Sequence, residues 1–127
     1  ICGVTTPADA AFAAEHGADA VGLNFYEKSP RYLTDDVGLA IVAELPLFCA
    51  TVGVFVTSSG VAVRMRSIPY RLRAVQTYGL PPTARQTFFP TAFVPPFRVR
   101  GAADLVDVRR YVSECPGRPA AVLIDSF

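Results

Sequence analysis

Ala50-Thr-Val-Gly-Val-Phe-Val56 is an unbroken apolar run that is rich in β-branched residues. A strand of a parallel sheet that is covered on both faces has this composition, whereas a strand with one wet face alternates apolar and polar residues. Parallel strands also require crossover connections, which are usually helices. The run therefore predicts an α/β protein built on a parallel sheet.

Strand and helix patterns alternate outward from this run in both directions. The expected strands are Ile1–Val4, Val21–Phe25, Ala50–Val56, Leu72–Tyr78, part of Phe93–Arg100, and Ala120–Asp125. The expected helices are Pro7–His16, a helix between Thr34 and Pro46, Ser58–Ile68, one or two turns within Thr83–Phe89, and Asp104–Cys115. Because proline cannot donate to a ladder, Pro95 and Pro96 are expected to lie outside the paired part of their strand.

Capping residues support the helix predictions. Thr6 precedes Pro7 at the first helical position, and Gly17 is a typical left-handed terminator. Thr34 is placed to cap the second helix, with Asp35 and Asp36 in its first turn. Val37, Ala40 and Ile41 are expected to share one face of the second helix, and Leu105, Val108 and Val112 are expected to face inward from the last.

About six βα units with short connections fit two parallel architectures, an open doubly wound sheet and a (β/α)₈ barrel. The segment Cys2-Gly-Val-Thr-Thr-Pro7 lacks the G-x-G-x-x-G spacing of a dinucleotide-binding fold. We therefore predict a TIM (β/α)₈ barrel, here truncated to about six βα units. Residues 1–127 are expected to form a single partial domain whose C-terminal units are missing, since both ends of the chain fall within strand patterns.

Composition excludes several classes of protein. Hydrophobic residues make up 51% and charged residues 18%, so the chain is globular and not disordered. A net charge of +1 without a Lys/Arg run argues against a nucleic-acid partner. No apolar run approaches the ~20 residues of a membrane helix. The odd cysteine count (Cys2, Cys49, Cys115) does not suggest disulfides, so a reducing, cytoplasmic location is expected.

Candidate functional residues follow from the barrel prediction, because barrel active sites lie at the C-terminal ends of the strands. Cys2, Gln76, Tyr78 and Asp125 fall at such ends. Arg31 follows the second strand, and Ser29-Pro30 stiffens the chain before it. Cys2 and Asp125 are expected to face each other across the barrel mouth, as a base and an acid acting on one small substrate.

Each candidate also has a structural interpretation. Cys2 could be a small buried hydrophobe, Asp125 a helix cap, Gln76 a satisfied strand-end amide, and Arg31 a solvated loop residue with an ion-pair partner. His16 is interpreted as structural, at a helix end where its charge suits the dipole. Cys49 and Cys115 are expected away from the active face. No metal site is expected, because no two candidate ligands have suitable spacing.

The chain resembles the phosphoribosylanthranilate isomerase family of tryptophan biosynthesis along nearly its whole length. The matching segments are Ile1-Cys-Gly-Val-Thr5, Gly17–Phe25, Ser29-Pro-Arg-Tyr32, Val52–Val56, Val75-Gln76, Phe97-Arg-Val99 and Leu123-Ile-Asp125, in the family's order. I-C-G followed by N-F-x-x-x-S-P-R-Y is a specific combination. The resemblance implies an enzyme that carries out the Amadori rearrangement of N-(5-phosphoribosyl)anthranilate, a phosphosugar, without a cofactor.

The resemblance also implies roles for individual residues. Cys2 corresponds to the family's general base, Asp125 to its general acid, and Arg31 to the arginine that holds the anthranilate moiety. Gln76 and Tyr78 correspond to substrate-binding positions, but the family's V-Q-L-H-G is Val75-Gln-Thr-Tyr-Gly79 here, with Tyr78 in place of histidine. The family's glycine-rich phosphate loops correspond to positions beyond Phe127.

Two other functions compete with the isomerase. One is a different phosphosugar barrel, against which Cys2 and Ser29-Pro-Arg31 argue. The other is a non-catalytic half-barrel that acts by association through its open edges. The sequence does not indicate an oligomeric state.

Overall fold

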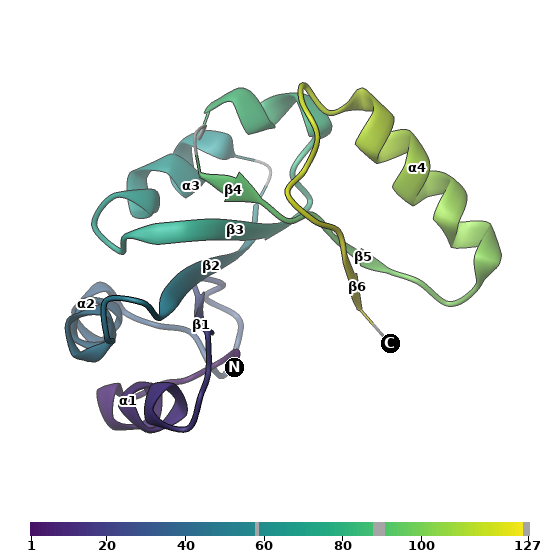
Figure 1. Ribbon diagram of the computed structural model, residues 1–127. Coiled ribbons are helices and arrows are strands. Elements are labelled where there is room, and N and C mark those ends of the chain that lie inside the picture. The colour runs from purple at the N-terminus through teal and green to yellow at the C-terminus, as the bar shows by residue number, and fades with distance from the viewer. Residues whose placement is uncertain (58, 88–90, 126–127) are drawn as a thin grey trace.

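The computed structural model describes residues 1–57, 59–87 and 91–125 (Figure 1). Within them the helices are α1 (Pro7–Glu15), α2 (Asp35–Glu44), α3 (Gly60–Ser67) and α4 (Leu105–Glu114), with 3₁₀ turns at Pro82–Thr87 and Ala102–Asp104. The strands are β1 (Ala20–Asn24), β2 (Ala50–Val56), β3 (Leu72–Tyr78), β4 (Ala92–Phe93), β5 (Pro96–Arg98) and β6 (Leu123–Asp125). No helix in the described part of the chain is long and apolar enough to cross a membrane.

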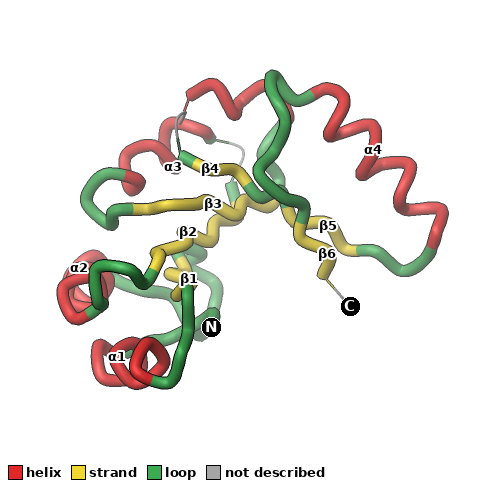
Figure 2. Tube along the Cα trace, in the orientation of Figure 1, coloured by secondary structure: helices red, strands yellow, loops and turns green. Residues whose placement is uncertain are grey.

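The strands pair in sequence order and are parallel. One sheet has the order β1-β2-β3-β4, and β5 pairs with β6 in a second. An open doubly wound sheet reverses its strand order at a switch point, whereas this order runs in one direction only. Figure 2 shows the helices along the outer side of the curved row of strands. The barrel-type prediction is confirmed as a truncated barrel, and the described residues do not close into a ring.

The expected first strand, Ile1–Val4, is reduced to a single parallel bridge between Cys2 and Gly22. The amide of Gly22 donates to the carbonyl of Ile1 over 2.8 Å, and the amide of Gly3 donates to the carbonyl of Gly22 over 3.3 Å. Cys2 is therefore held in register with β1, although only a short part of the segment pairs.

The pairing register divides the sheet into two faces. Leu23, Gly53, Val75 and Phe93 are aligned across β1 to β4, and the side chains of Leu23, Val75 and Phe93 are fully buried. This face packs under the helices. The neighbouring row, Gly22-Val52-Ala74-Ala92, lies on the opposite face, since side chains alternate along a strand. The second row is the inner face of the partial barrel.

Local signals placed most helix ends correctly. The Thr6 side chain accepts a hydrogen bond from the Asp9 amide over 3.1 Å, and Gly17 has φ +88° after α1. Thr34 stands at the N-cap of α2, but its side chain makes no capping hydrogen bond. The buried side of α2 is formed by Gly38, Ile41 and Val42, so Ala40, which is exposed, does not share the burial of Ile41.

The prolines act differently from the prediction. Pro96 is the first residue of β5 and is the register partner of Leu123, so it lies inside a paired segment. The Val94 amide still donates to Val75 of β3, after which the Pro95 carbonyl accepts from the Leu123 amide. Because neither proline has an N–H to donate, pairing with β3 stops and pairing with β6 begins. One expected strand therefore becomes β4 and β5.

The last helix, α4, lies over the second sheet, but none of its residues is buried. Tyr111 of α4 packs edge-on against Phe97, with ring centroids 5.3 Å apart, and lies near Phe93. Val108 and Val112 are half-buried, as expected for inward positions, but Leu105 is 41% exposed and that part of the prediction is wrong. The expected helix within Thr83–Phe89 is a 3₁₀ turn up to Thr87, and its last two residues lie outside the described part.

Candidate active site

The register places the candidate strand residues on the inner face. Cys2 is bridged to Gly22, which belongs to the inner row. Gln76 and Tyr78 are two and four residues beyond Ala74 of the same row, so they share its face. All of these residues lie toward the C-terminal ends of their strands, where a barrel carries its active site.

Asp125 belongs to this face as well. It is the last residue of β6 and the register partner of Arg98 at the end of β5. Phe97, one residue earlier, packs outward against α4 through Tyr111. Alternation then turns Arg98 and Asp125 inward. The four strand residues predicted from sequence thus share one face and one end of the strands.

Cys2 is an exposed free thiol, so its interpretation as a buried, inert cysteine is wrong. Its side chain lies over Gly22: a Cβ on Gly22 would approach the Cys2 Sγ to 2.8 Å, which is too close for unbonded atoms. Glycine at position 22 therefore creates the space that the thiol occupies, and the thiol remains open to a small molecule.

Arg31 is positioned by a network that starts on β1. The Asn24 side-chain amide donates to the Ser29 hydroxyl over 3.1 Å, and the same hydroxyl accepts from the Arg31 amide over 3.1 Å. The side-chain oxygen Oδ1 of Asn24 accepts a hydrogen bond from the Tyr26 amide over 2.9 Å. Asn24, which is buried, thus fixes the loop that carries the arginine.

The Arg31 side chain reaches back toward Cys2. Its Nη1 donates to the Cys2 carbonyl over 3.4 Å. Gly3 makes this approach possible, because a Cβ there would lie 2.5 Å from Arg31 Cδ and 2.6 Å from Nη1. Gly3 also has φ +86°, a conformation that favours glycine. The structure therefore brings the predicted base and the predicted anion-binding residue together.

Tyr78 and Asp125 form a second contact on the same face. The Tyr78 hydroxyl donates to Asp125 Oδ2 over 2.9 Å. Burial raises the pKa of Tyr78, and the hydrogen bond to Asp125 and the charge of Asp125 add to the rise. The Gln76 amide and the positive charge of Arg98 act in the opposite direction on this pKa. Tyr78 and Asp125 are therefore directly joined, and Gln76 lies beside them on the same face.

Sequence reasoning missed several supporting residues. Asn24, Gly3 and Gly22 were given no role in the site, nor was Arg98, and Ser29 was expected only to stiffen the chain with Pro30, not to bond Asn24 and Arg31 through its hydroxyl. A buried amide at the end of an apolar strand was a signal for Asn24. The two glycines carried no local signal, because their need for space depends on side chains that are distant in sequence.

The remaining reactive side chains lie in structural surroundings. His16 Nδ1 is 2.8 Å from the Phe12 carbonyl, and its ring stacks on Phe12, which agrees with its structural interpretation. The Cys49 thiol donates to the Ala18 carbonyl over 3.4 Å, before β2, and Cys115 is buried. Among the described residues no group of three potential ligands could hold a metal ion.

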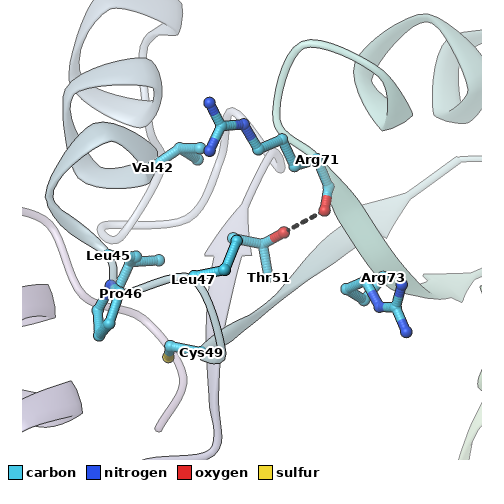
Figure 3. A pocket seen from close by; sticks show the side chains of 8 residues that line it. All are labelled: Val42, Leu45, Pro46, Leu47, Cys49, Thr51, Arg71 and Arg73. Atoms are coloured by element: carbon cyan, nitrogen blue, oxygen red, sulfur yellow. Dashed lines mark hydrogen bonds between the residues drawn. The ribbon is translucent and has the colours of Figure 1, made fainter.

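A cavity of about 240 Å³ lies at the opposite, N-terminal ends of β2 and β3 (Figure 3). Arg71 and Arg73 line it beside apolar side chains of the segment after α2, and the Thr51 hydroxyl donates to the Arg71 carbonyl over 2.7 Å. None of the candidate residues lines this cavity. This N-terminal end of a barrel contributes to stability, whereas the active site lies at the C-terminal end.

Comparisons with known proteins identify relatives of this chain. No family model matches the chain. The N-(5'-phosphoribosyl)anthranilate isomerase of Geobacter sulfurreducens is 36% identical over 127 residues, which are 100% of this chain and 60% of the relative. The isomerase of the same name from Myxococcus xanthus is 38% identical over 125 residues, 98% of this chain and 58% of the relative.

Two solved structures that are similar to this chain are also phosphoribosyl anthranilate isomerases. The phosphoribosyl anthranilate isomerase of Thermotoga maritima aligns with a TM-score of 0.87 at 33% identity, over 100% of this chain and 60% of its own. A second isomerase structure, in complex with reduced 1-(o-carboxyphenylamino)-1-deoxyribulose 5-phosphate, has a TM-score of 0.86 at 34% identity, over 99% of this chain and 63% of its own. The chain thus spans about 60% of the length of these relatives.

Proposed function

We propose that this chain, a homologue over its whole length of the N-(5'-phosphoribosyl)anthranilate isomerases, carries the acid, the base and the anthranilate site of such an isomerase. The observation that supports the proposal best is the common inner face of Cys2, Gln76, Tyr78 and Asp125, with Arg31 against the Cys2 backbone. The substrate would be the phosphosugar N-(5-phosphoribosyl)anthranilate, in tryptophan biosynthesis. A cytoplasmic location is part of the proposal.

The reaction needs one proton donor and one proton acceptor. Asp125 would deliver its proton to the ribose ring oxygen while the bond from C1′ to that oxygen breaks, and the anilino nitrogen lone pair would form the C1′=N bond of a protonated imine. The Cys2 thiolate would then remove the proton from C2′. The electron pair of that C–H bond would form the C1′=C2′ bond of an enolamine as the imine π electrons return to nitrogen. Tautomerisation of the enolamine gives the 1-deoxyribulose product. The sequence of steps involves no net redox change and no cofactor.

Arg31 would hold the anthranilate carboxylate. A planar guanidinium binds a carboxylate through two parallel hydrogen bonds, which fixes orientation as well as position. Because Arg31 Nη1 already reaches the Cys2 carbonyl, a carboxylate bound there would lie near the base. The substrate carbon to be deprotonated would thereby be brought within range of the thiol.

The test of this proposal combines two substitutions with matched controls. Cys2→Ala and Asp125→Asn are each expected to lower kcat by about 10²–10⁴, the usual contribution of a general base or acid. The controls Cys49→Ala and Asp107→Asn are expected to retain kcat. The Cys49 thiol donates to a backbone carbonyl, and the Asp107 carboxylate pairs with a surface arginine. The measurement is conversion of N-(5-phosphoribosyl)anthranilate, with circular dichroism to confirm folding.

The outcomes separate the competing functions. Near-normal kcat in either Cys2→Ala or Asp125→Asn would exclude the assigned role of that residue. No turnover even when the chain is extended to the length of its relatives, together with stable association, would favour the half-barrel that acts through its edges. Turnover of another phosphosugar instead would favour a different barrel enzyme.

A further inference from the structure

The contact between Tyr78 and Asp125 joins two strands that are not neighbours. Tyr78 ends β3 of the first sheet and Asp125 ends β6 of the second, with β4 and β5 between them along the chain. The hydrogen bond of 2.9 Å therefore spans the inner face and does not belong to a ladder. Such a contact fixes the direction of the carboxyl group, which the backbone of a terminal strand residue leaves free to rotate.

The hydrogen-bonding capacity of Tyr78 is directed at protein groups. A phenol has one O–H to donate, and here Asp125 Oδ2 accepts it. Gln76 lies two residues earlier on the same face of β3, and its amide acts to lower the pKa of this hydroxyl. The one O–H of Tyr78 is thus committed to Asp125.

We infer that Tyr78 is a positioning residue for Asp125 and not a ligand of the substrate. Its O–H occupies Oδ2, so that the proton which Asp125 transfers is carried on Oδ1. This inference rests on the proposed function for the role of Asp125 as the acid. It also replaces the substrate-binding role that the sequence suggested for Tyr78.

Tyr78 is suited to this task because it keeps its proton. Burial and the neighbouring Asp125 raise its pKa above the ordinary value for tyrosine, so the hydroxyl remains a donor wherever the enzyme works. The groups that face it are Gln76 on its own strand, Arg98 on β5 and Asp125 on β6. Arg98 lowers this pKa, but the rise due to burial and Asp125 is larger.

The first experiment tests the contact by spectroscopy on this chain. The protein is labelled with [¹³Cζ]-tyrosine, and each tyrosine is titrated by NMR, with Tyr78→Phe identifying the Tyr78 signal. In Asp125→Asn, Tyr78 is expected to lose its proton at a lower pH than in the unaltered protein, because the carboxylate charge that opposes ionisation has gone. An unchanged Tyr78 titration would overturn the inference, whether or not the protein is active.

The second experiment tests how the contact acts in the reaction. Tyr78→Phe is expected to lower kcat by about 10- to 100-fold, the range expected when a reacting group is displaced by an ångström or less. KM should change by less than about twofold, since no substrate contact is lost. A raised KM with normal kcat would identify Tyr78 as a substrate ligand and would overturn the inference.

A double substitution distinguishes action through Asp125 from a separate effect. In an Asp125→Asn background, Tyr78→Phe should cause no further loss of kcat, because the group that it positions is already inactive. Two independent losses that multiply would contradict the inference. The matched control is Tyr111→Phe, since Tyr111 is also half-buried, has its pKa raised to about 12 by burial, and donates to the Leu80 carbonyl over 2.6 Å.

These outcomes are separate from failure of the proposed function. If the chain does not convert the phosphosugar even when extended to the length of its relatives, the isomerase proposal fails, and the titration still decides whether Tyr78 holds Asp125. If it does convert the substrate, the kinetic cycle decides whether that contact serves the acid.

Discussion

At Gly3 and Gly17 the backbone has nearly the same left-handed conformation, with φ +86° and +88°, but the surroundings differ. A Cβ on Gly3 would meet three atoms of the Arg31 side chain within 2.9 Å, whereas a Cβ on Gly17 would meet nothing within 4 Å. The two positions therefore separate the cost of a left-handed backbone from the cost of moving Arg31.

We predict that Gly3→Ala and Gly17→Ala each lower the free energy of unfolding by about 1–3 kcal/mol, because a side chain disfavours positive φ. Only Gly3→Ala should also raise KM, since it displaces the guanidinium that would bind the anthranilate carboxylate. Denaturant unfolding and steady-state kinetics measure the two effects. Equal KM values in the two variants would show that Arg31 does not bind the substrate from its present position.

Arg31 itself gives a second prediction at this scale. Arg31→Lys keeps the charge but loses the planar, two-pronged donor, so KM should rise by about 10-fold or more, equivalent to about 1.4 kcal/mol of binding. Arg64→Lys, on the exposed side of α3, is the matched control and should leave KM unchanged. Unaltered kcat/KM in Arg31→Lys would mean that the residue is a surface arginine without a role in binding.

Among the elements, α1 and α2 show that a capping sequence does not guarantee a capping contact. Both helices follow a threonine in an extended conformation, but only Thr6 makes the hydrogen bond, to the Asp9 amide. The Thr6 hydroxyl also donates to the Asp9 carboxylate over 2.8 Å, which closes a reciprocal pair. The two helices therefore provide an internal comparison.

We predict that Thr6→Ala lowers the free energy of unfolding by about 1 kcal/mol, within the usual range for a lost N-cap. Thr34→Ala should cost clearly less, because no side-chain hydrogen bond is lost at α2. Thermal and denaturant unfolding of both variants provide the measurement. A larger loss at Thr34 than at Thr6 would contradict the capping assignment.

In the molecule as a whole, one open sheet edge carries exposed apolar side chains. Leu123 and Ile124 of β6 are 37% and 53% exposed, and α4 has no buried residue. In the described residues β6 pairs only with β5, so its other edge presents unpaired backbone groups. An apolar strand edge of this kind is a template for pairing with another chain.

We predict that the 127-residue chain by itself associates in solution and is at most weakly active. Apolar edge strands favour association, and relatives are longer by the part that would supply further strands and binding energy. Light scattering and isomerase assays on this chain test the prediction, and Ile124→Lys should reduce association because a charge opposes edge pairing. A monodisperse, fully active monomer would refute it.

The order of elements was predictable from the sequence because each signal for it is local. The apolar run Ala50–Val56 predicts its own strand, as does the segment Leu72–Tyr78, and both strands have the predicted bounds. Thr6, Pro7 and Gly17 likewise determine the ends of α1 within a few residues. A parallel sheet follows from this alternation, as do the candidate residues, because each stands at the end of such a strand.

The sheet's register and its contacts were decided only by the tertiary structure. Whether Cys2 finds space depends on Gly22, the reach of Arg31 depends on Gly3, and the partner of Asp125 is Tyr78, 47 positions earlier. No local preference encodes these pairs, since each arises from how strands align across the sheet. For the same reason Pro96 pairs and Leu105 remains exposed against expectation. Sequence alone thus determined the βα order and the types of residue at the site, while packing between distant segments decided which of them meet.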